Sequence, residues 1–191
     1  MATTLNASEA LERLKAGNEK FVKDSLSHDR QDVTRRESYS GGVQEPYAII
    51  LSCADSRVVP ELVFDEGIGD VFVIRVAGNI ANASSIASIE YAVANLGVKL
   101  IVVLGHENCG AVKATVANHP KSDISPALDH LVDHIMPVVN SKEDDVNTCV
   151  KLNAKKAVKD LTEKSTIISE ADGLEIVSGY YNLASGKVDF L

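Results

Sequence analysis

The 191-residue sequence has no long apolar run and no excess of basic charge. Its longest apolar runs span about five residues, whereas a membrane-spanning helix needs roughly 20. Aspartate and glutamate number 27 against 19 lysines and arginines, which gives a net charge of −8. We therefore expect no membrane partner and no nucleic-acid partner, because anionic membranes and nucleic acids are both bound by basic surfaces.

Cysteine is also scarce in this chain. Its three cysteines are an odd number spread along the sequence, so they do not indicate a disulfide framework. Residues 1–15 contain Glu9 and Glu12 and no apolar stretch, which argues against a secretory signal. We therefore expect a reducing compartment, the cytoplasm, in which each thiol is free for metal binding or catalysis.

Short apolar runs alternate with amphipathic segments over most of the sequence. The runs predict strands at residues 47–51, 71–75, 100–104 and 174–180, with a last edge segment at 188–191. Helical patterns occupy residues 60–64, 84–96, 110–117, 126–136 and 144–161. This alternation predicts an α/β fold with a mostly parallel sheet of four to five strands flanked by helices.

The first 45 residues have a different composition from the rest. Asn6 and Glu9 have the spacing of a capping box, and apolar residues follow at helical intervals, so we expect an N-terminal helical arm. Residues 25–45 are polar and form either a linker or a strap. We therefore divide the chain into a helix and strap, 1–45, and a single α/β domain, 46–191.

Soft metal ligands follow two of the predicted strands. Cys53 lies two residues past the first strand and His106 two residues past the third, while Cys109 can reach the same ion as His106 from one turn. Cys53 can join them only if the first and third strands are neighbours, and we therefore expect the strand order 2-1-3-4. Ligands bind at the carboxyl ends of such strands. Two thiolates and one imidazole suit Zn²⁺ and leave a fourth position open.

A charged pair follows the first of these ligands. Asp55 and Arg57 can point the same way if the backbone is extended, and the arginine would keep the carboxylate ionised. Such a carboxylate beside a metal-bound water would accept its proton in a hydrogen bond. From the residues alone, alternatives stay open: buried thiols with a surface ion pair and no metal, or Asp55 as a fourth ligand that makes a zinc-stabilised binding protein.

Two motifs, CADSR at residues 53–57 and GHENCG at 105–110, resemble those of the β-class carbonic anhydrases. Residues 44–46, 70–75, 79 and 89–93 are also similar to that family, so the resemblance runs from about residue 44 to 117. It implies reversible hydration of carbon dioxide to bicarbonate and a proton, through hydroxide on one Zn²⁺ per subunit. By the same resemblance, Cys53, His106 and Cys109 would hold the zinc. Asp55 would accept a hydrogen bond from the zinc-bound water, and Arg57 would fix Asp55.

The resemblance also implies a shared substrate pocket. Gln44, Phe72 and Tyr91 would line it from a second subunit, and the backbone N–H of Gly110 would help to place the substrate. Apolar Phe72 and Ala77 would suit carbon dioxide. Members of the family are dimers or multiples of dimers, so we expect a homodimer or homotetramer in which residues 1–45 pack on the partner subunit. A hydrolase of carbonyl sulfide or carbon disulfide on the same scaffold is the alternative enzyme.

The sequence also departs from its apparent relatives. Some members hold a regulatory bicarbonate beside a tryptophan three residues before the first zinc cysteine, but this chain has no tryptophan and carries Ile50 there. We therefore expect no such regulation. Many relatives have Asn-x-Ala-Asn where this chain has VAGN at residues 76–79, which predicts a roomier pocket wall at Ala77 and Gly78. Two thiolates should acidify bound water less than imidazoles do, so we expect a pH–rate profile shifted upward and Asp55 off the metal at neutral pH.

Overall fold

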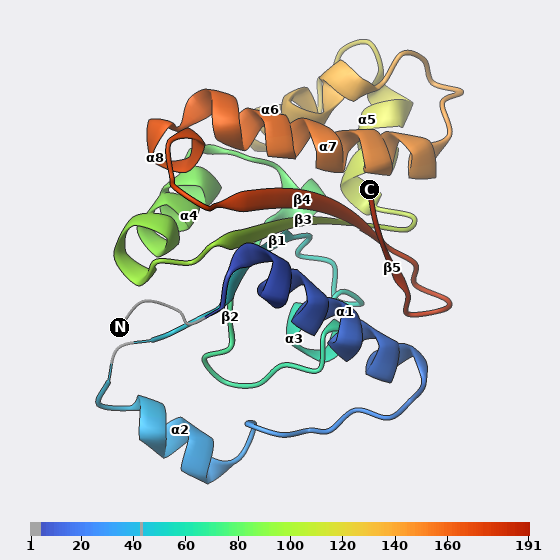
Figure 1. Ribbon diagram of the computed structural model, residues 1–191. Helices are drawn as coiled ribbons and strands as arrows, with labels where there is room; N and C mark the ends of the chain where they lie inside the picture. The colour runs from blue at the N-terminus through green and yellow to red at the C-terminus, as the bar shows by residue number, and fades with distance from the viewer. Residues whose placement is uncertain (1–4, 43) are drawn as a thin grey trace.

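Five strands form one sheet at the centre of the computed structural model, which describes residues 5–42 and 44–191 (Figure 1). The strands are β1 (Ala48–Ser52), β2 (Val71–Arg75), β3 (Leu100–His106), β4 (Glu175–Tyr181) and β5 (Val188–Phe190). Their order is β2-β1-β3-β4-β5; the first four are parallel, and β5 is antiparallel to β4. The predicted α/β class and the order 2-1-3-4 are therefore confirmed.

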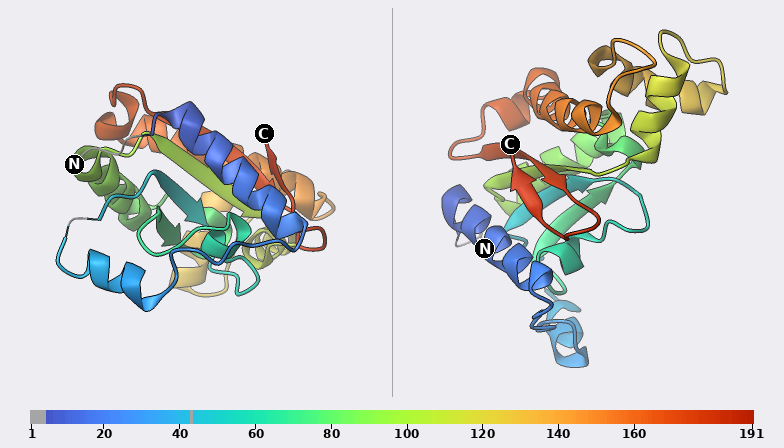
Figure 2. Two further views of the ribbon diagram at one scale, coloured as in Figure 1. Left: turned by 60° about the horizontal axis from the view of Figure 1, so that its bottom comes forward. Right: turned by 90° about the vertical axis from the view of Figure 1, so that its right-hand side faces the viewer.

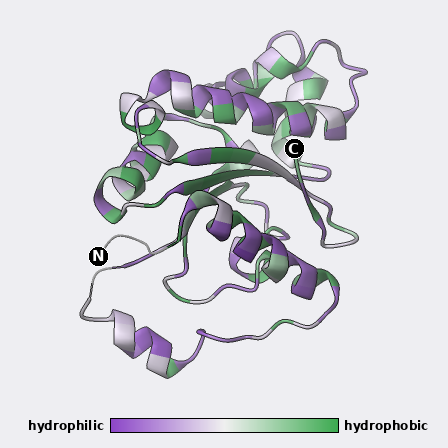
Figure 3. Cartoon of the chain, viewed as in Figure 1, coloured by the Kyte–Doolittle hydropathy of each residue, from purple (hydrophilic) through white to green (hydrophobic). Residues whose placement is uncertain are grey.

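Helices cover both faces of this sheet (Figure 1). They are α1 (Ala7–Val22), α2 (Val33–Tyr39), α3 (Pro60–Val63), α4 (Ala83–Leu96), α5 (Gly110–Asn118), α6 (Pro126–Ile135), α7 (Val146–Lys164) and α8 (Thr166–Ser169), with 3-10 turns η1 at Ala77–Asn79 and η2 at Met136–Val138. Helices α4 and α7 pack on one face, and α1 and α3 pack on the other. Both α1 and α7 alternate between hydrophilic and hydrophobic residues (Figure 3), as amphipathic surface helices do.

The central strands read as continuous apolar runs because both of their faces are covered. All five residues of β1 are buried. Since side chains alternate along a strand, Ala48 and Ile50 join the core under α1, while Ile49 and Leu51 join the core under α4 and α7. The sheet is thus held from both sides, and the ends of β1 and β3 are fixed in place.

Local sequence signals at the helix ends act as expected. The side chains of Asn6 and Glu9 form the reciprocal hydrogen bonds of a capping box at the start of α1. Gly97 ends α4 in the left-handed conformation, with φ of 69°. The capping box fixes the residue at which α1 begins. The helix is held on the sheet of its own chain by the burial of Ala10 and Leu14.

The polar stretch at residues 25–45 contains a helix that composition alone did not reveal. Helix α2 begins after Asp32, whose side chain accepts a hydrogen bond from the backbone N–H of Arg35, and it projects from the rest of the molecule (Figure 2). The segment is tied to its own chain, since Arg30 and Arg35 both form ion pairs with buried Asp70. That residues 1–45 also pack on a partner subunit stays a prediction. In the described part of the chain, no helix is long and apolar enough to cross a membrane.

Candidate metal centre

The strand order brings two distant segments of sequence together. Strands β1 and β3 are adjacent and parallel, with Ser52 opposite Leu104, so their carboxyl ends meet at one edge of the sheet. Cys53 follows β1 directly, and His106 is the last residue of β3. Cys109 caps the start of α5, and Asn108 takes a positive φ of 55° in the turn before it. The fold therefore collects three potential ligands where open α/β sheets bind theirs.

These three side chains form a compact donor set. The sulfur atoms of Cys53 and Cys109 and a ring nitrogen of His106 all lie within 4.8 Å of one another. The three residues are 4%, 1% and 0% exposed, respectively. Two soft sulfurs and one imidazole nitrogen are the ligand types that zinc takes when a fourth position is left open.

The imidazole of His106 is oriented as a metal ligand would be. Its Nδ1 lies 3.0 Å from the carbonyl oxygen of Glu107, so Nδ1 carries the proton and the lone pair is on Nε2. Nε2 is buried and has no hydrogen-bond partner among residues 5–42 and 44–191. An unpaired buried polar atom costs about 1–3 kcal/mol, and a bound cation removes that cost. The donor set therefore fits a divalent metal ion.

The two thiols influence each other's ionisation. A hydrogen bond from Cys109 lowers the pKa of the Cys53 thiol, whereas the same hydrogen bond and burial raise the pKa of Cys109. The first thiolate therefore forms readily, but a second negative charge beside it requires a compensating cation. A divalent ion supplies this charge, so metal binding and release of the second proton are coupled.

Asp55 stands beside this donor set and is held by Arg57. Its two carboxylate oxygens accept hydrogen bonds from Nε and Nη2 of Arg57 at 2.9 and 2.7 Å, and the Arg57 backbone N–H adds a third at 2.9 Å. These bonds hold the pKa of the Asp55 carboxyl well below its usual range. Oδ2 of Asp55 lies 3.8 Å from Nε2 of His106. An ionised acceptor is thus fixed next to the metal ligands.

A second arginine fixes the backbone of the same loop. The guanidinium of Arg75, at the end of β2, donates to the carbonyl oxygens of Cys53 and Asp55 at 3.1 and 2.6 Å. Arg75 lies within residues 70–75, which resemble the family, but the sequence alone indicates no role for it. Because the loop carries one ligand and the carboxylate, these bonds fix the separation between the two.

The structure brings some predicted pocket residues to the centre and leaves others away from it. Gly110 follows Cys109 as the first residue of α5, and a side chain there would meet nothing within 4 Å. Ala77 precedes Gly78, whose backbone contacts Cys53. Gly110 and Ala77 are therefore each adjacent in sequence to a residue of the donor set or to one that contacts it.

Phe72, Tyr91 and Gln44 do not join the centre within one chain. Phe72 is opposite Ile49, four positions before Cys53 or about 13 Å along a parallel strand. Its ring lies 6.5 Å from that of Tyr91, which is 49% exposed, and Gln44 is exposed as well. Their predicted role in the pocket of a second subunit stays a prediction.

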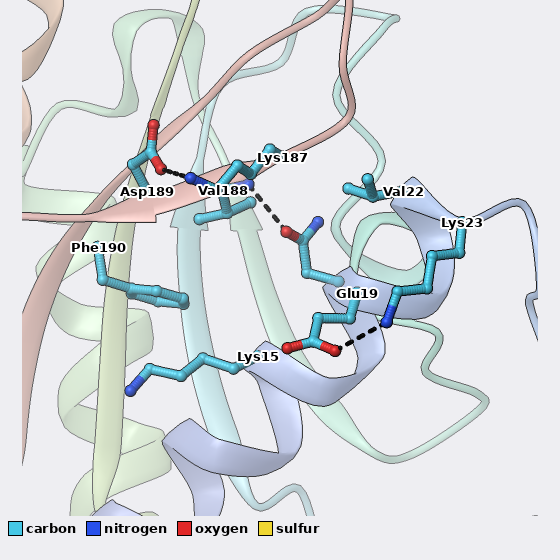
Figure 4. Close-up of a pocket in the computed structure, with 9 residues that line it drawn as sticks. Lys15, Glu19, Val22, Lys23, Lys187, Val188, Asp189 and Phe190 are labelled. Atoms are coloured by element: carbon cyan, nitrogen blue, oxygen red, sulfur yellow. Dashed lines mark hydrogen bonds and ion pairs between the residues drawn. The ribbon is translucent and has the colours of Figure 1, made fainter.

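A separate groove of about 520 Å³ lies between α1 and β5 (Figure 4). Three lysines line it, but each is paired with a carboxylate: Lys15 with Glu12, Lys23 with Glu19 and Lys187 with Asp189. Each lysine charge in the groove is therefore already paired with a carboxylate, and we take the Cys53, His106 and Cys109 donor set as the candidate functional site.

Two buried residues behind Cys53, Gly78 and Asn153, make contacts that were not predicted from the sequence. Gly78 donates its backbone N–H to the Cys53 sulfur, and Asn153 of α7 donates to the carbonyl oxygen of Gly78. Asn153 shares its side of α7 with buried Val150, Ala154 and Ala157. A polar residue within an apolar helical face was the available signal, because such a group needs a specific partner.

The comparisons with known proteins agree with this geometry. The family model described as "Carbonic anhydrase" matches residues 48–188. A carbonic anhydrase of Mycolicibacterium smegmatis is 37% identical over 192 aligned positions, covering 96% of this chain and 93% of that protein. The crystal structure of the β-carbonic anhydrase CafA of Aspergillus fumigatus aligns with a TM-score of 0.73 and 28% identity, over 96% of this chain and 89% of that one. The Coccomyxa β-carbonic anhydrase, in complex with acetazolamide, has a TM-score of 0.73 and 29% identity, over 95% of this chain and 86% of its own.

Proposed function

Because the chain belongs to the β class of the carbonic anhydrase family, we infer that it catalyses the reversible hydration of carbon dioxide to bicarbonate and a proton. One observation supports this inference at the level of residues. Two cysteine sulfurs and one imidazole nitrogen lie within 4.8 Å of one another, beside the ionised carboxylate of Asp55. We propose that the metal is one Zn²⁺ per subunit, held by Cys53, His106 and Cys109. Their donor types suit zinc better than a hard cation such as Mg²⁺.

Each residue of the centre has a distinct proposed task. Zinc, when bound, would lower the pKa of its water to about 7, so that hydroxide becomes available near neutral pH. Asp55 accepts a hydrogen bond from the attacking water or hydroxide, which directs an oxygen lone pair at carbon dioxide. Arg57 holds Asp55 in that orientation. The backbone N–H of Gly110, at the start of α5, donates to a substrate oxygen.

The pairing of Asp55 with Arg57 supports an open metal site over a closed one. Both carboxylate oxygens already accept hydrogen bonds from the guanidinium. To become a fourth metal ligand, Asp55 would have to give up at least one of these bonds. The non-catalytic, zinc-stabilised binding protein requires that rearrangement as its permanent state, so the enzyme is the better-supported function.

We also propose that two subunits complete the pocket. Strand β2 is at the edge of the sheet, and Phe72 on this strand and nearby Tyr91 present an apolar surface there. A second chain on this edge would cover Tyr91 and could bring Gln44, Phe72 and Tyr91 to the partner's metal. We propose the cytoplasm as the compartment, because the three free thiols need a reducing environment.

The test combines metal content with turnover. Purified protein should contain one zinc per chain and hydrate carbon dioxide in stopped-flow assays from about pH 6 to 9, which brackets the pKa of zinc-bound water. Full zinc occupancy with a buffer-level rate throughout would overturn the enzymatic assignment. Assaying carbonyl sulfide and carbon disulfide on the same preparation separates the related hydrolases, since faster sulfide release than carbon dioxide hydration would change the substrate.

A further inference from the structure

A chain of two hydrogen bonds connects helix α7 to the sulfur of Cys53. Gly78, in the η1 turn after β2, donates its backbone N–H to Sγ of Cys53 over 3.4 Å. The carbonyl oxygen of Gly78 accepts a hydrogen bond of 2.8 Å from Nδ2 of Asn153. Asn153 is only 2% exposed. A buried amide on a helix outside the metal-binding loops is thus coupled to one candidate ligand through a single glycine.

Gly78 needs this restraint because of its conformation. Its φ is +68° and its ψ is 15°, a region that glycine adopts freely and other residues rarely do. A Cβ atom there would meet Cδ1 of Ile135 at 2.7 Å and Cβ of Ala111 at 3.2 Å. Helices α5 and α6 therefore close the space on one side of Gly78. The hydrogen bond from Asn153 fixes the carbonyl on the other side, and the two restraints together direct the N–H at Cys53.

An asparagine is not needed at this position to attach α7 to the sheet. The neighbouring buried residues Val150, Ala154, Ala157 and Leu161 provide an apolar face for that purpose. Burying an amide among them costs free energy unless the amide is hydrogen-bonded, and its nitrogen donates to Gly78. The placement of this side chain is therefore explained by what it does for Gly78.

We propose that Asn153 is a positioning residue of the metal centre, which holds Gly78 so that its N–H stays on the Cys53 sulfur and sets the strength and direction of the metal–thiolate bond. Partners of this kind fix ligand orientation, and their removal typically weakens metal affinity about 10- to 100-fold. The inference rests on the proposed function only in requiring a metal at the Cys53, His106 and Cys109 site.

The first test uses the unaltered protein loaded with ¹¹³Cd²⁺. If the Gly78 N–H bonds to a metal-bound sulfur, the Gly78 amide proton should show scalar coupling to the cadmium nucleus through that hydrogen bond. The absence of coupling, in protein whose cadmium chemical shift reports two thiolate ligands, would overturn the proposal. Protein that binds no cadmium at this site would instead count against the proposed function as well.

The second test replaces the amide by an apolar group of similar size. In Asn153→Leu, and in Asn153→Ala should the larger side chain prevent folding, the Gly78 coupling should weaken or vanish. The affinity for Zn²⁺, measured by competition with a chromophoric chelator, should fall about 10- to 100-fold. In Co²⁺-substituted protein, the thiolate-to-cobalt charge-transfer band should move to lower energy, because a thiolate that loses a hydrogen bond is easier to oxidise.

Asn18→Leu provides the matched control. Asn18 is also a buried helical asparagine that donates to backbone carbonyls, those of Val63 and Gly186, but it lies on α1 on the other side of the sheet. Its replacement should lower the midpoint of urea unfolding and leave the cobalt spectrum and zinc affinity unchanged. If Asn153 variants keep the wild-type cobalt band and bind zinc within about twofold of wild type, or if Asn18→Leu moves both readouts equally, the role of Asn153 is merely structural and the proposal fails.

Discussion

Replacing Asp55 by asparagine tests the proposed role of the carboxylate most directly. The amide has the same shape, but one carboxylate oxygen becomes an NH₂ group that faces Nη2 of Arg57, now 2.7 Å from an acceptor. Two donors then oppose each other, and the side chain loses the negative charge with which it accepts a hydrogen bond from the attacking water. The three metal ligands are unchanged, so zinc content should stay at one per chain.

The expected loss of activity follows from the surroundings of Asp55. A preorganised hydrogen-bond partner of a reacting group contributes about 10²- to 10³-fold to catalysis. The Asp55 side chain is 16% exposed, so water can replace part of its function, and the lower end of that range applies. We expect kcat/KM for Asp55→Asn to fall about 100-fold, which corresponds to about 2.7 kcal/mol in the activation barrier.

The assay is stopped-flow hydration of carbon dioxide by zinc-loaded protein, with zinc measured on the same samples. Asp160→Asn is the matched control, because Asp160 is also a largely buried carboxylate paired with cationic side chains, Lys156 and Lys164, but it lies on α7 and not on a metal-binding loop. It should retain wild-type turnover. A rate for Asp55→Asn within about threefold of wild type, at full zinc occupancy, would refute the proposed hydrogen-bond role.

Three further predictions concern the metal, the strap and the subunit contact. Cys109→Ser removes a soft ligand, so zinc content should drop far below one per chain and carbon dioxide hydration should fall to the buffer rate; retained zinc and activity would show that Cys109 is not a ligand. Asp70→Asn removes the ion pairs of Asp70 with Arg30 and Arg35, although Arg30 keeps a second partner in Glu66. Since both arginines are partly exposed, we expect the free energy of unfolding in urea at pH 7 to fall by about 2 kcal/mol. Burial opposes ionisation of Asp70, but hydrogen bonds from Arg30 and Gly67 lower its pKa overall. The stability that the Asp70 carboxylate contributes is therefore present above its unfolded pKa near 4, and the difference in unfolding free energy between wild type and variant should shrink as the pH falls below about 4. A difference that grows in acid would contradict the ion-pair explanation. Tyr91→Arg places a charge on the predicted contact surface, so sedimentation equilibrium should show a smaller assembly with unchanged zinc content, and an unchanged mass would place the contact elsewhere.

The parts of the fold that could be predicted are those where local sequence and burial agree. The strands β1, β2 and β3 are apolar runs because helices cover the sheet at those positions. The candidate metal ligands could be proposed because Cys53 and His106 both follow such runs, and the structure brings them together. Cys53 and His106 can meet only if the strands before them are neighbours, and the strand order 2-1-3 was predicted from that requirement. Chemistry thus supplied a long-range constraint that hydrophobic patterns do not contain.

The parts that could not be predicted depend on contacts between distant segments. Helix α2 lies in a stretch without an apolar face, and it is tied down by ion pairs to Asp70, which is 35 positions away from Arg35. Asn153 acts through Gly78, which is 75 positions away. The sequence around Arg35 does not indicate Asp70 as its partner, and the sequence around Asn153 does not indicate Gly78. These contacts are found only in the folded structure.

The topology places the candidate metal ligands and the predicted pocket residues in different parts of the sheet. Cys53, His106 and Cys109 come from the adjacent ends of β1 and β3, so one folded chain provides the complete donor set. Phe72 lies away from this site, near the opposite end of the β1–β2 pairing, where it is paired with Ile49. We therefore expect Phe72 to serve the metal centre of a neighbouring chain placed along the β2 edge. We therefore expect zinc affinity to be a property of the single chain and turnover to depend on assembly.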